Sequence, residues 1–115
     1  MNNRGREGEE NAVIALKEAG LQILAQNFRS KEGEIDIIAK DGEKIVFVEV
    51  KAWSTFGIEN LRYGLDARKR HKIIKTAKFF LSKNRQYNNM SIRFDVIFVE
   101  NNSVTHLVSA FEEGV

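Results

Sequence analysis

Residues 33–51 read GEIDIIAKDGEKIVFVEVK, and this stretch determines how the rest of the chain can be arranged. Its first half, GEIDIIA, alternates as a strand does, which predicts Ile35 and Ile37 on one face and Asp36 on the other. The Asp-Gly pair that follows is typical of a tight turn, because glycine accepts positive φ angles. The second half, KIVFVEVK, is almost continuously apolar, as in a strand covered by helices on both faces. The stretch therefore predicts a hairpin inside a helix-covered sheet.

The other periodic segments complete a mixed α/β fold. Apolar residues at helical spacing, followed by Gly20 as a stop signal, predict an N-terminal helix. The expected elements are a helix over 7–19, a strand over 21–28, the hairpin, a helix over 65–83, and strands over 91–99 and 103–108. The first three strands suggest an antiparallel meander, with a crossover after it. We therefore expect the order α-β-β-β-α-β-β, with a mixed central sheet flanked by helices, in one domain spanning residues 1–115.

Composition excludes several classes of protein. The chain is 43% hydrophobic and 30% charged, which is ordinary for a folded domain and argues against general disorder. It contains no cysteine, so a disulfide scaffold, cysteine-ligated zinc and thiol catalysis are excluded. No apolar run approaches the roughly 18 residues of a membrane span, and the polar first residues show no signal peptide. We therefore expect a cytoplasmic protein that does not associate with membranes.

Positive charge is concentrated in one segment, although the net charge is only +2. Between Arg62 and Arg85 there are nine basic residues and one acidic residue, whereas acids outnumber bases in the rest of the chain. Arg68, Lys72 and Lys75 fall outside the apolar stripe of the predicted helix. This pattern suits a polyanionic partner such as DNA, and it equally suits a solvated helix face.

The aromatic residues give little sign of a platform for stacking bases. Phe79, Phe80, Phe94 and Phe98 occur at helix or strand spacing and are predicted to belong to the core. Trp53 is the only tryptophan. Its side chain could stack on a base or sugar of bound DNA, or pack against the loop that follows it.

Two acids and a lysine lie where strand propensity would not place them. Glu49 and Lys51 are two residues apart near the end of an apolar strand, so both side chains are expected on one face. Because the turn lies near residues 41–42, antiparallel pairing brings Asp36 beside them. Two carboxylates and an ammonium group are costly to bury without partners, and a hard divalent cation offsets that cost. The sequence thus favours a Mg²⁺ site, with Mn²⁺ as the alternative ion.

The same three residues supply the parts that phosphodiester cleavage needs. A metal activates water and absorbs charge on the phosphate, and a lysine adds positive charge beside the nucleophile. A salt bridge between Lys51 and either acid is the alternative interpretation. Simpler roles are expected for three other charged residues: Asp95 pairs with a neighbouring basic residue, His106 lies on the surface, and Glu34 is a surface acid or an outer group of the metal site.

The order of the motifs resembles a known family. The spacing Asp36-x₁₂-Glu49-Val50-Lys51 is similar to the PD-(D/E)XK signature of nucleases with the restriction-endonuclease-like fold. More closely, residues 5–99 resemble the YraN family of small uncharacterised proteins. The matching stretches are GREGEENA, NFRSKEGEIDIIAKDG, IVFVEVK, ARKRHKIIKTAKFFL and RFDVIFV, of which GEID and FVEVK are the most specific. The resemblance implies a restriction-endonuclease-like sandwich and a DNA nuclease related to Holliday-junction resolvases.

The resemblance also implies a role for each matching residue in the hairpin. Asp36 and Glu49 would be metal ligands, with the backbone carbonyl of Val50 as a third. Lys51 would orient or help to deprotonate the attacking water, or stabilise the developing charge.

Further roles are implied on the two helices. A glutamate on the first helix completes the metal site in resolvase-like members, and here it matches Glu9, with Glu10 as the neighbouring alternative. Lys69 would contact the DNA backbone, together with the basic helix face. The chain departs from the family pattern at Trp53, where a basic residue is usual, and this puts one phosphate contact in doubt. By analogy with resolvases, a homodimer is also implied.

These observations leave three functions open. The first is a Mg²⁺-dependent endonuclease acting on DNA, with double-stranded, branched or otherwise structured DNA as its substrate. The second is a non-catalytic nucleic-acid-binding module that retains the nuclease fold. The third is a protein-interaction adaptor in which the acids and the lysine merely pair.

Overall fold

The computed structural model describes residues 3–52 and 67–113. The elements in this part of the chain are α1 (Asn3–Glu18), β1 (Gln22–Ser30), β2 (Gly33–Asp41), β3 (Lys44–Ala52), α3 (Ala67–Lys83), the short 3-10 helix η2 (Arg85–Tyr87), β4 (Ser91–Glu100) and β5 (Ser103–Phe111). The predicted order is confirmed, and α1 begins four residues earlier than expected. None of the helices in these two ranges is long and apolar enough to cross a membrane.

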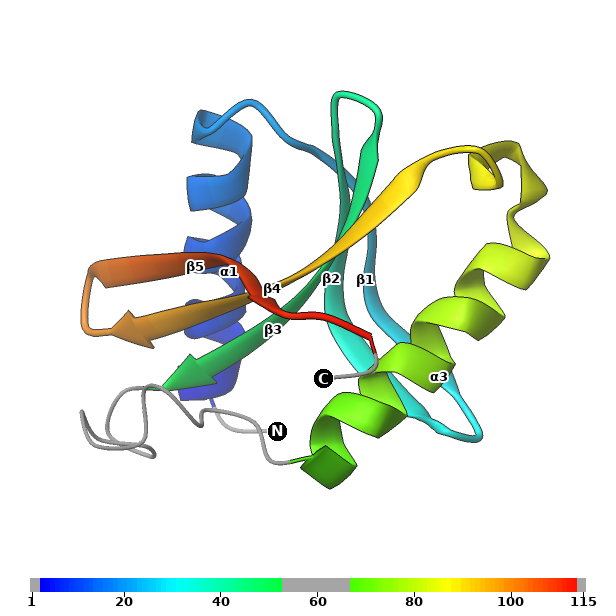
Figure 1. Cartoon of the computed structure of the whole chain (residues 1–115). Helices are drawn as coiled ribbons and strands as arrows, with labels where there is room; N and C mark the ends of the chain where they lie inside the picture. The colour runs from blue at the N-terminus through cyan, green and yellow to red at the C-terminus, as the bar shows by residue number, and fades with distance from the viewer. Residues whose placement is uncertain (1–2, 53–66, 114–115) are drawn as a thin grey trace.

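The five strands form one mixed sheet in the order β1-β2-β3-β4-β5. The first three strands pair antiparallel, β3 and β4 are parallel, and β5 returns antiparallel to β4. The predicted meander and crossover are therefore present. Figure 1 shows α1 and α3 on opposite sides of this twisted sheet.

Two glycines end elements where the sequence predicts it. Gly20 has a φ of 93°, and its N–H donates to the carbonyl of Lys17, while the N–H of Leu21 donates to that of Leu16. These bonds satisfy carbonyls at the end of α1. Gly42, with a φ of 61°, occupies the turn between β2 and β3. Both positions need the left-handed conformation that glycine adopts readily.

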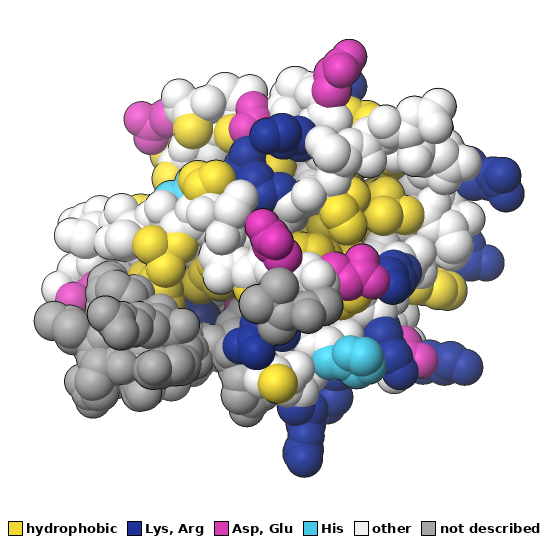
Figure 2. All heavy atoms as spheres, in the orientation of Figure 1, with side chains coloured by type: hydrophobic (Ala, Val, Ile, Leu, Met, Phe, Trp, Pro, Cys, Tyr) yellow, Lys and Arg dark blue, Asp and Glu magenta, His cyan; other side chains and the backbone are white. Residues whose placement is uncertain are grey.

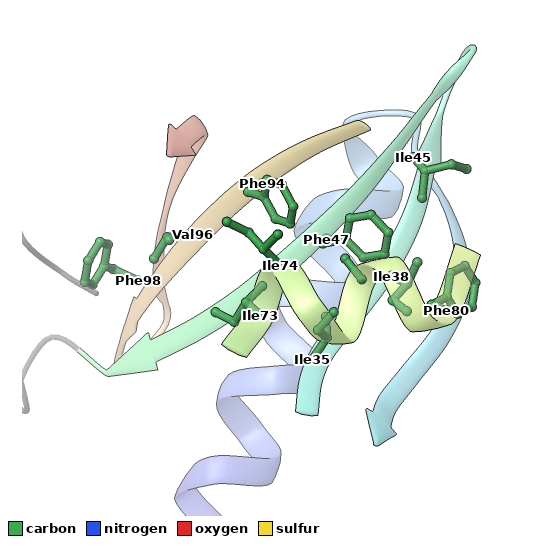
Figure 3. Packing of buried hydrophobic residues seen from close by; sticks show 11 residues of the cluster. Ile35, Ile38, Ile45, Phe47, Ile73, Ile74, Phe80, Phe94, Val96 and Phe98 are labelled. Atoms are coloured by element: carbon green, nitrogen blue, oxygen red, sulfur yellow. The ribbon is translucent and has the colours of Figure 1, made fainter. Parts of the chain in front are cut away.

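The helices bury the two faces of the sheet in separate clusters. On one face, Ile73 and Phe80 of α3 pack with Ile38 and Phe47 (Figure 3). On the other face, Leu16 of α1 packs within a second cluster, whose other members are Ala12, Leu21, Ile37, Ala39, Val46, Val48, Ile97 and Val99. β3 thus contributes to both clusters, as its apolar sequence predicts. Each fully buried large side chain contributes about 1.5–3 kcal/mol of transfer free energy.

The predicted alternation of β2 is wrong at Ile35. This side chain packs on the α3 face with Ile38, whereas Ile37 lies in the cluster under α1. The alternation breaks at Asp36, where the pairing of β2 with β3 has already ended. Opposite this point on β1, Asn27 has a φ of 53°, which is unusual in a strand. The irregularity turns Ile35 toward α3.

The prediction for Phe79 is also wrong. Phe80, Phe94 and Phe98 are buried as expected, but Phe79 is 41% exposed. Neighbouring positions of a helix point in directions about 100° apart, and at this point of α3 Phe80 faces the sheet while Phe79 faces outward.

Candidate functional site

The strands β2 and β3 separate at one end, and this fork holds the predicted acids. Their pairing runs from the turn to Ile37 opposite Val48, and beyond that point the strands diverge (Figure 1). At the fork, the backbone N–H of Val50 donates to Oδ2 of Asp36 at 2.8 Å. A carboxylate thus takes the position of a backbone acceptor and is held between the two strands.

Glu49 and Lys51 project from one face of β3, as predicted. They continue the row of Ile45 and Phe47 toward α3. Nζ of Lys51 lies 3.7 Å from Oε1 of Glu49, and both side chains are largely buried. The predicted pair of acid and lysine is therefore present as a close contact.

The carboxyl groups of Asp36 and Glu49 meet at this fork. Burial, the charge of Asp36 and a hydrogen bond with Asp36 together raise the pKa of Glu49 to about 8. Lys51 and Lys69 lower the pKa of Glu49, but their effect is smaller than the effects that raise it. The two acids therefore share a region that favours one negative charge over two.

The residues at the fork fit a hard divalent cation. Mg²⁺ is commonly held by one or two carboxylates together with water and phosphate oxygens, which matches Asp36 and Glu49. In a strand, the N–H and C=O of one residue point to the same side. Since the N–H of Val50 points to Asp36, its carbonyl faces the fork as well. Among residues 3–52 and 67–113, no three His, Cys, Asp or Glu side chains form a group suited to a metal ion.

Glu9 of α1 lies near this site but does not complete a group of three acids. Burial raises the pKa of Glu9, and the charges of Asp36 and Glu34 raise it further, while a hydrogen bond with Asn27 lowers it. Glu10 is exposed and points to a different hollow, beside Ile14. Of the two predicted alternatives, Glu9 is the one whose carboxyl interacts with the fork.

Asn27 and Lys69 belong to this region in ways that the sequence does not reveal. Asn27 bonds to Glu9 from an irregular position in β1. Lys69, predicted to contact the DNA backbone, is half-buried and close enough to Glu49 to lower its pKa. A lone asparagine in a strand and one lysine among many give no distinguishing signal. Glu34 pairs on the surface with Arg29 at 3.0 Å.

Comparison with known proteins identifies the family. The model of "Uncharacterised protein family UPF0102" matches residues 8–99. The chain belongs to this family. A UPF0102 protein of Persephonella marina is 45% identical over 109 residues, covering 95% of this chain and 93% of the relative. A UPF0102 protein of Clostridioides difficile is 42% identical over 120 residues, covering 96% and 100%. The YraN family, which the motifs resemble, is this same family.

The basic residues of this UPF0102 chain extend from the fork along α3. Arg68, Lys72 and Lys75 are exposed, as a binding surface for phosphates requires. Figure 2 shows Lys and Arg side chains standing out at the right and lower edge of the view, where α3 lies. The predicted contact through Trp53 lies outside the described residues.

A third buried acid, Asp95, is fully paired within the fold. Arg93 contacts both carboxylate oxygens of Asp95 at 2.9 and 3.0 Å, which confirms the predicted pair. Nε2 of His106 lies 2.7 Å from Oδ2, and the N–H of Ser109 donates to Oδ1 at 3.0 Å. Burial alone raises the pKa of Asp95, but the hydrogen bonds with His106, Arg93 and Ser109 outweigh it, so this pKa is lowered. His106 is thus a structural residue that is half-buried against Asp95, rather than fully exposed on the surface.

Proposed function

We propose that this UPF0102 protein is a cytoplasmic, Mg²⁺-dependent endonuclease that hydrolyses phosphodiester bonds of DNA, with branched or structured DNA among its substrates. One observation carries the proposal: two buried carboxyl groups, Asp36 and Glu49, meet beside Lys51 where two strands separate. Two buried carboxyl groups side by side cost stability when both are ionised, and such pairs are frequent at sites that hold a ligand or carry out a reaction. A divalent cation is the ligand that this chemistry favours.

Each residue at the fork has a role in the proposed reaction. Asp36, Glu49 and the Val50 carbonyl would hold the cation. When bound, the cation supplies Lewis acidity toward water and toward phosphate oxygens. The ammonium group of Lys51, held against Glu49, would orient the attacking water or stabilise charge that develops on the phosphate. Hydrolysis by in-line attack of water would leave 5′-phosphate ends.

The exposed basic residues of α3 would bind the DNA backbone. Lys69 lies beside the fork, and Arg68, Lys72 and Lys75 are exposed on the same helix. These basic side chains form a row that begins near Asp36 and Glu49. They would bind successive phosphates along the helix and place one phosphate at the fork. Binding of this kind weakens steeply as salt concentration rises.

Cleavage assays on defined DNA substrates test the proposal. The purified protein is incubated with Mg²⁺ and linear, nicked or four-way-junction DNA, beside Glu49→Ala and the control Glu43→Ala, which removes an exposed acid from the turn. We expect wild type and Glu43→Ala to cleave at least one substrate and Glu49→Ala to be inactive. If wild type and Glu49→Ala behave identically on all substrates, the catalytic proposal fails.

A non-catalytic nucleic-acid-binding module is the second candidate. It is favoured by the lack of a three-acid group among the described residues and by the bond between Asp36 and the Val50 N–H, which already gives this carboxylate a structural partner. Calorimetric titration with Mg²⁺ distinguishes the two functions. The endonuclease requires a cation site that is lost in Asp36→Asn and Glu49→Gln, whereas a binding module shows salt-sensitive DNA binding without such a site.

A further inference from the structure

We propose that a hollow centred on Phe79 binds an unpaired base of a nucleic-acid strand. The hollow lies between the turn that joins β1 to β2 and the outer side of α3. It has a volume of about 490 Å³ and is lined by Ser30, Lys31, Glu32, Lys75, Lys78 and Phe79. We call it the Phe79 hollow.

Phe79 presents a large apolar surface to solvent from a rigid support. Its ring centroid lies 6.1 Å from that of Phe28, which in turn makes an edge contact of 5.2 Å with the buried Phe80. The exposed ring is therefore anchored to the core, and 41% of the residue remains accessible. An aromatic ring held in this way is a suitable partner for stacking, because little conformational entropy is lost when a planar ligand binds.

The charges around the ring favour a nucleic acid over other planar ligands. Three lysines and one glutamate line the hollow, and Nζ of Lys83 lies 5.5 Å from the centre of the Phe79 ring. Lys78 forms an ion pair with Glu113. A phosphate group of the nucleic acid would compete with Glu113 for the ammonium group of Lys78. Exposed aromatic rings interleaved with cations are typical of sites for single-stranded nucleic acids, where a base stacks and the phosphates contact lysine. A base pair inside a duplex cannot offer its face to Phe79, because both of its faces are stacked.

The Phe79 hollow lies further along α3 than Lys69, which is the residue of this helix beside the fork. Phe79 follows Lys69 by ten residues on α3, which corresponds to about 15 Å along the helix axis. That distance is about four nucleotides at the rise of 3.4 Å that a strand has in duplex DNA, and fewer nucleotides span it in an extended single strand. If the proposed function is correct, a strand cleaved at the fork would continue unpaired into the Phe79 hollow. The substrate would then carry a single-stranded arm or a branch beside the scissile bond.

Binding measured without cleavage tests this inference separately from the nuclease proposal. Fluorescence anisotropy in EDTA compares a short labelled single strand of DNA with a blunt duplex of the same length. We expect Phe79→Ala to weaken binding of the single strand about tenfold and to leave binding of the duplex unchanged. Phe79→Tyr retains a stacking ring and should bind as wild type does. Ile14→Ala removes another exposed hydrophobic side chain (54%) from α1 and serves as the control, and thermal denaturation verifies that each variant is folded.

Salt dependence separates stacking from charge. Phe79→Ala should leave the slope of log affinity against log salt unchanged. The double variant Lys75→Gln/Lys78→Gln should reduce that slope by about 1.4, which corresponds to two phosphate contacts on a single strand.

Three results decide between the possibilities. If Phe79→Ala binds the single strand as tightly as wild type, the inference is overturned and the endonuclease proposal is unaffected. If binding depends on Phe79 but wild type cleaves no substrate, the inference is supported and the endonuclease proposal fails. If sedimentation instead shows a dimer that Phe79→Ala dissociates without a change in DNA affinity, the hollow is a surface for a second copy of the chain, and the inference is overturned.

Discussion

Two clusters of buried charge lie on the same sheet and differ in how their acids are neutralised. Asp95 is 1% exposed, and both of its oxygens accept hydrogen bonds from within the fold. Glu49 is 7% exposed, its ammonium partner Lys51 is 3.7 Å away, and its other close neighbour is a second acid, Asp36. The pKa of Asp95 is therefore lowered, whereas the pKa of Glu49 is raised to about 8.

Under the proposed function, this difference separates an acid that the fold itself neutralises from an acid that serves a ligand. The fold supplies Asp95 with an arginine in bidentate contact, a histidine and a backbone N–H, so this cluster is complete without a ligand. At the fork, Lys51 and Lys69 lower the pKa of Glu49 but do not offset the effects that raise it, and under the proposed function a divalent cation would complete the site.

The largest effect is expected for removal of the Asp95 carboxylate. Asp95→Ala leaves Arg93 buried without its main partner, which should lower the free energy of unfolding by about 3–5 kcal/mol. Chemical denaturation measures this value. The matched variant Asp41→Asn removes the exposed partner of Arg93 and should cost less than about 1 kcal/mol. Equal losses in the two variants would show that Asp95 is not the centre of the cluster.

At the fork, in the absence of metal, removal of an acid is expected to raise the free energy of unfolding rather than lower it. The raised pKa of Glu49 means that the folded protein favours its protonated form, so the contribution of Glu49 to stability is greatest below the ordinary pKa of 4.5 and is lost as pH rises toward 8. Glu49→Gln has no such loss. Above pH 8 in EDTA, this variant should be about 1–3 kcal/mol more stable than wild type, by chemical denaturation.

The control for this experiment is acidic pH, at which wild type and Glu49→Gln should have similar free energies of unfolding. A variant that is less stable than wild type at every pH would mean that Glu49 is neutralised by its neighbours, as Asp95 is.

A smaller effect is expected from adding Mg²⁺. At a concentration ten times its dissociation constant, a ligand that binds only the folded state stabilises it by about 1.4 kcal/mol. Thermal denaturation should therefore show a higher melting temperature for wild type in Mg²⁺ and no change for Glu49→Gln. If Mg²⁺ stabilises wild type and Glu49→Gln to the same extent, the cation binds at a site other than the fork.

The smallest effect is expected for the histidine of the Asp95 cluster. His106→Ala removes one of several hydrogen bonds to Asp95, and Arg93 and Ser109 remain. The free energy of unfolding should fall by about 1 kcal/mol. A loss as large as that of Asp95→Ala would mean that His106, rather than Arg93, is the main partner.

The sequence was sufficient to predict the sheet and to bring Asp36 near Glu49, because a tight turn fixes the register of a hairpin. It did not predict that the strands would separate there, and so Ile35 was assigned to the wrong face. Local pattern also could not decide which of the adjacent Phe79 and Phe80 would be buried, since that depends on where α3 meets the sheet. For the same reason, the contact between His106 and Asp95 could not be predicted from the sequence of either strand alone, because it depends on how the two strands pair.

The hydrogen bond from Val50 to Asp36 makes the fork observable by spectroscopy. Because this amide proton points at Oδ2 of Asp36, its chemical shift should respond to ionisation or ligation of that carboxylate. A nuclear magnetic resonance titration could then follow occupancy of the fork at a single resonance, with no DNA present.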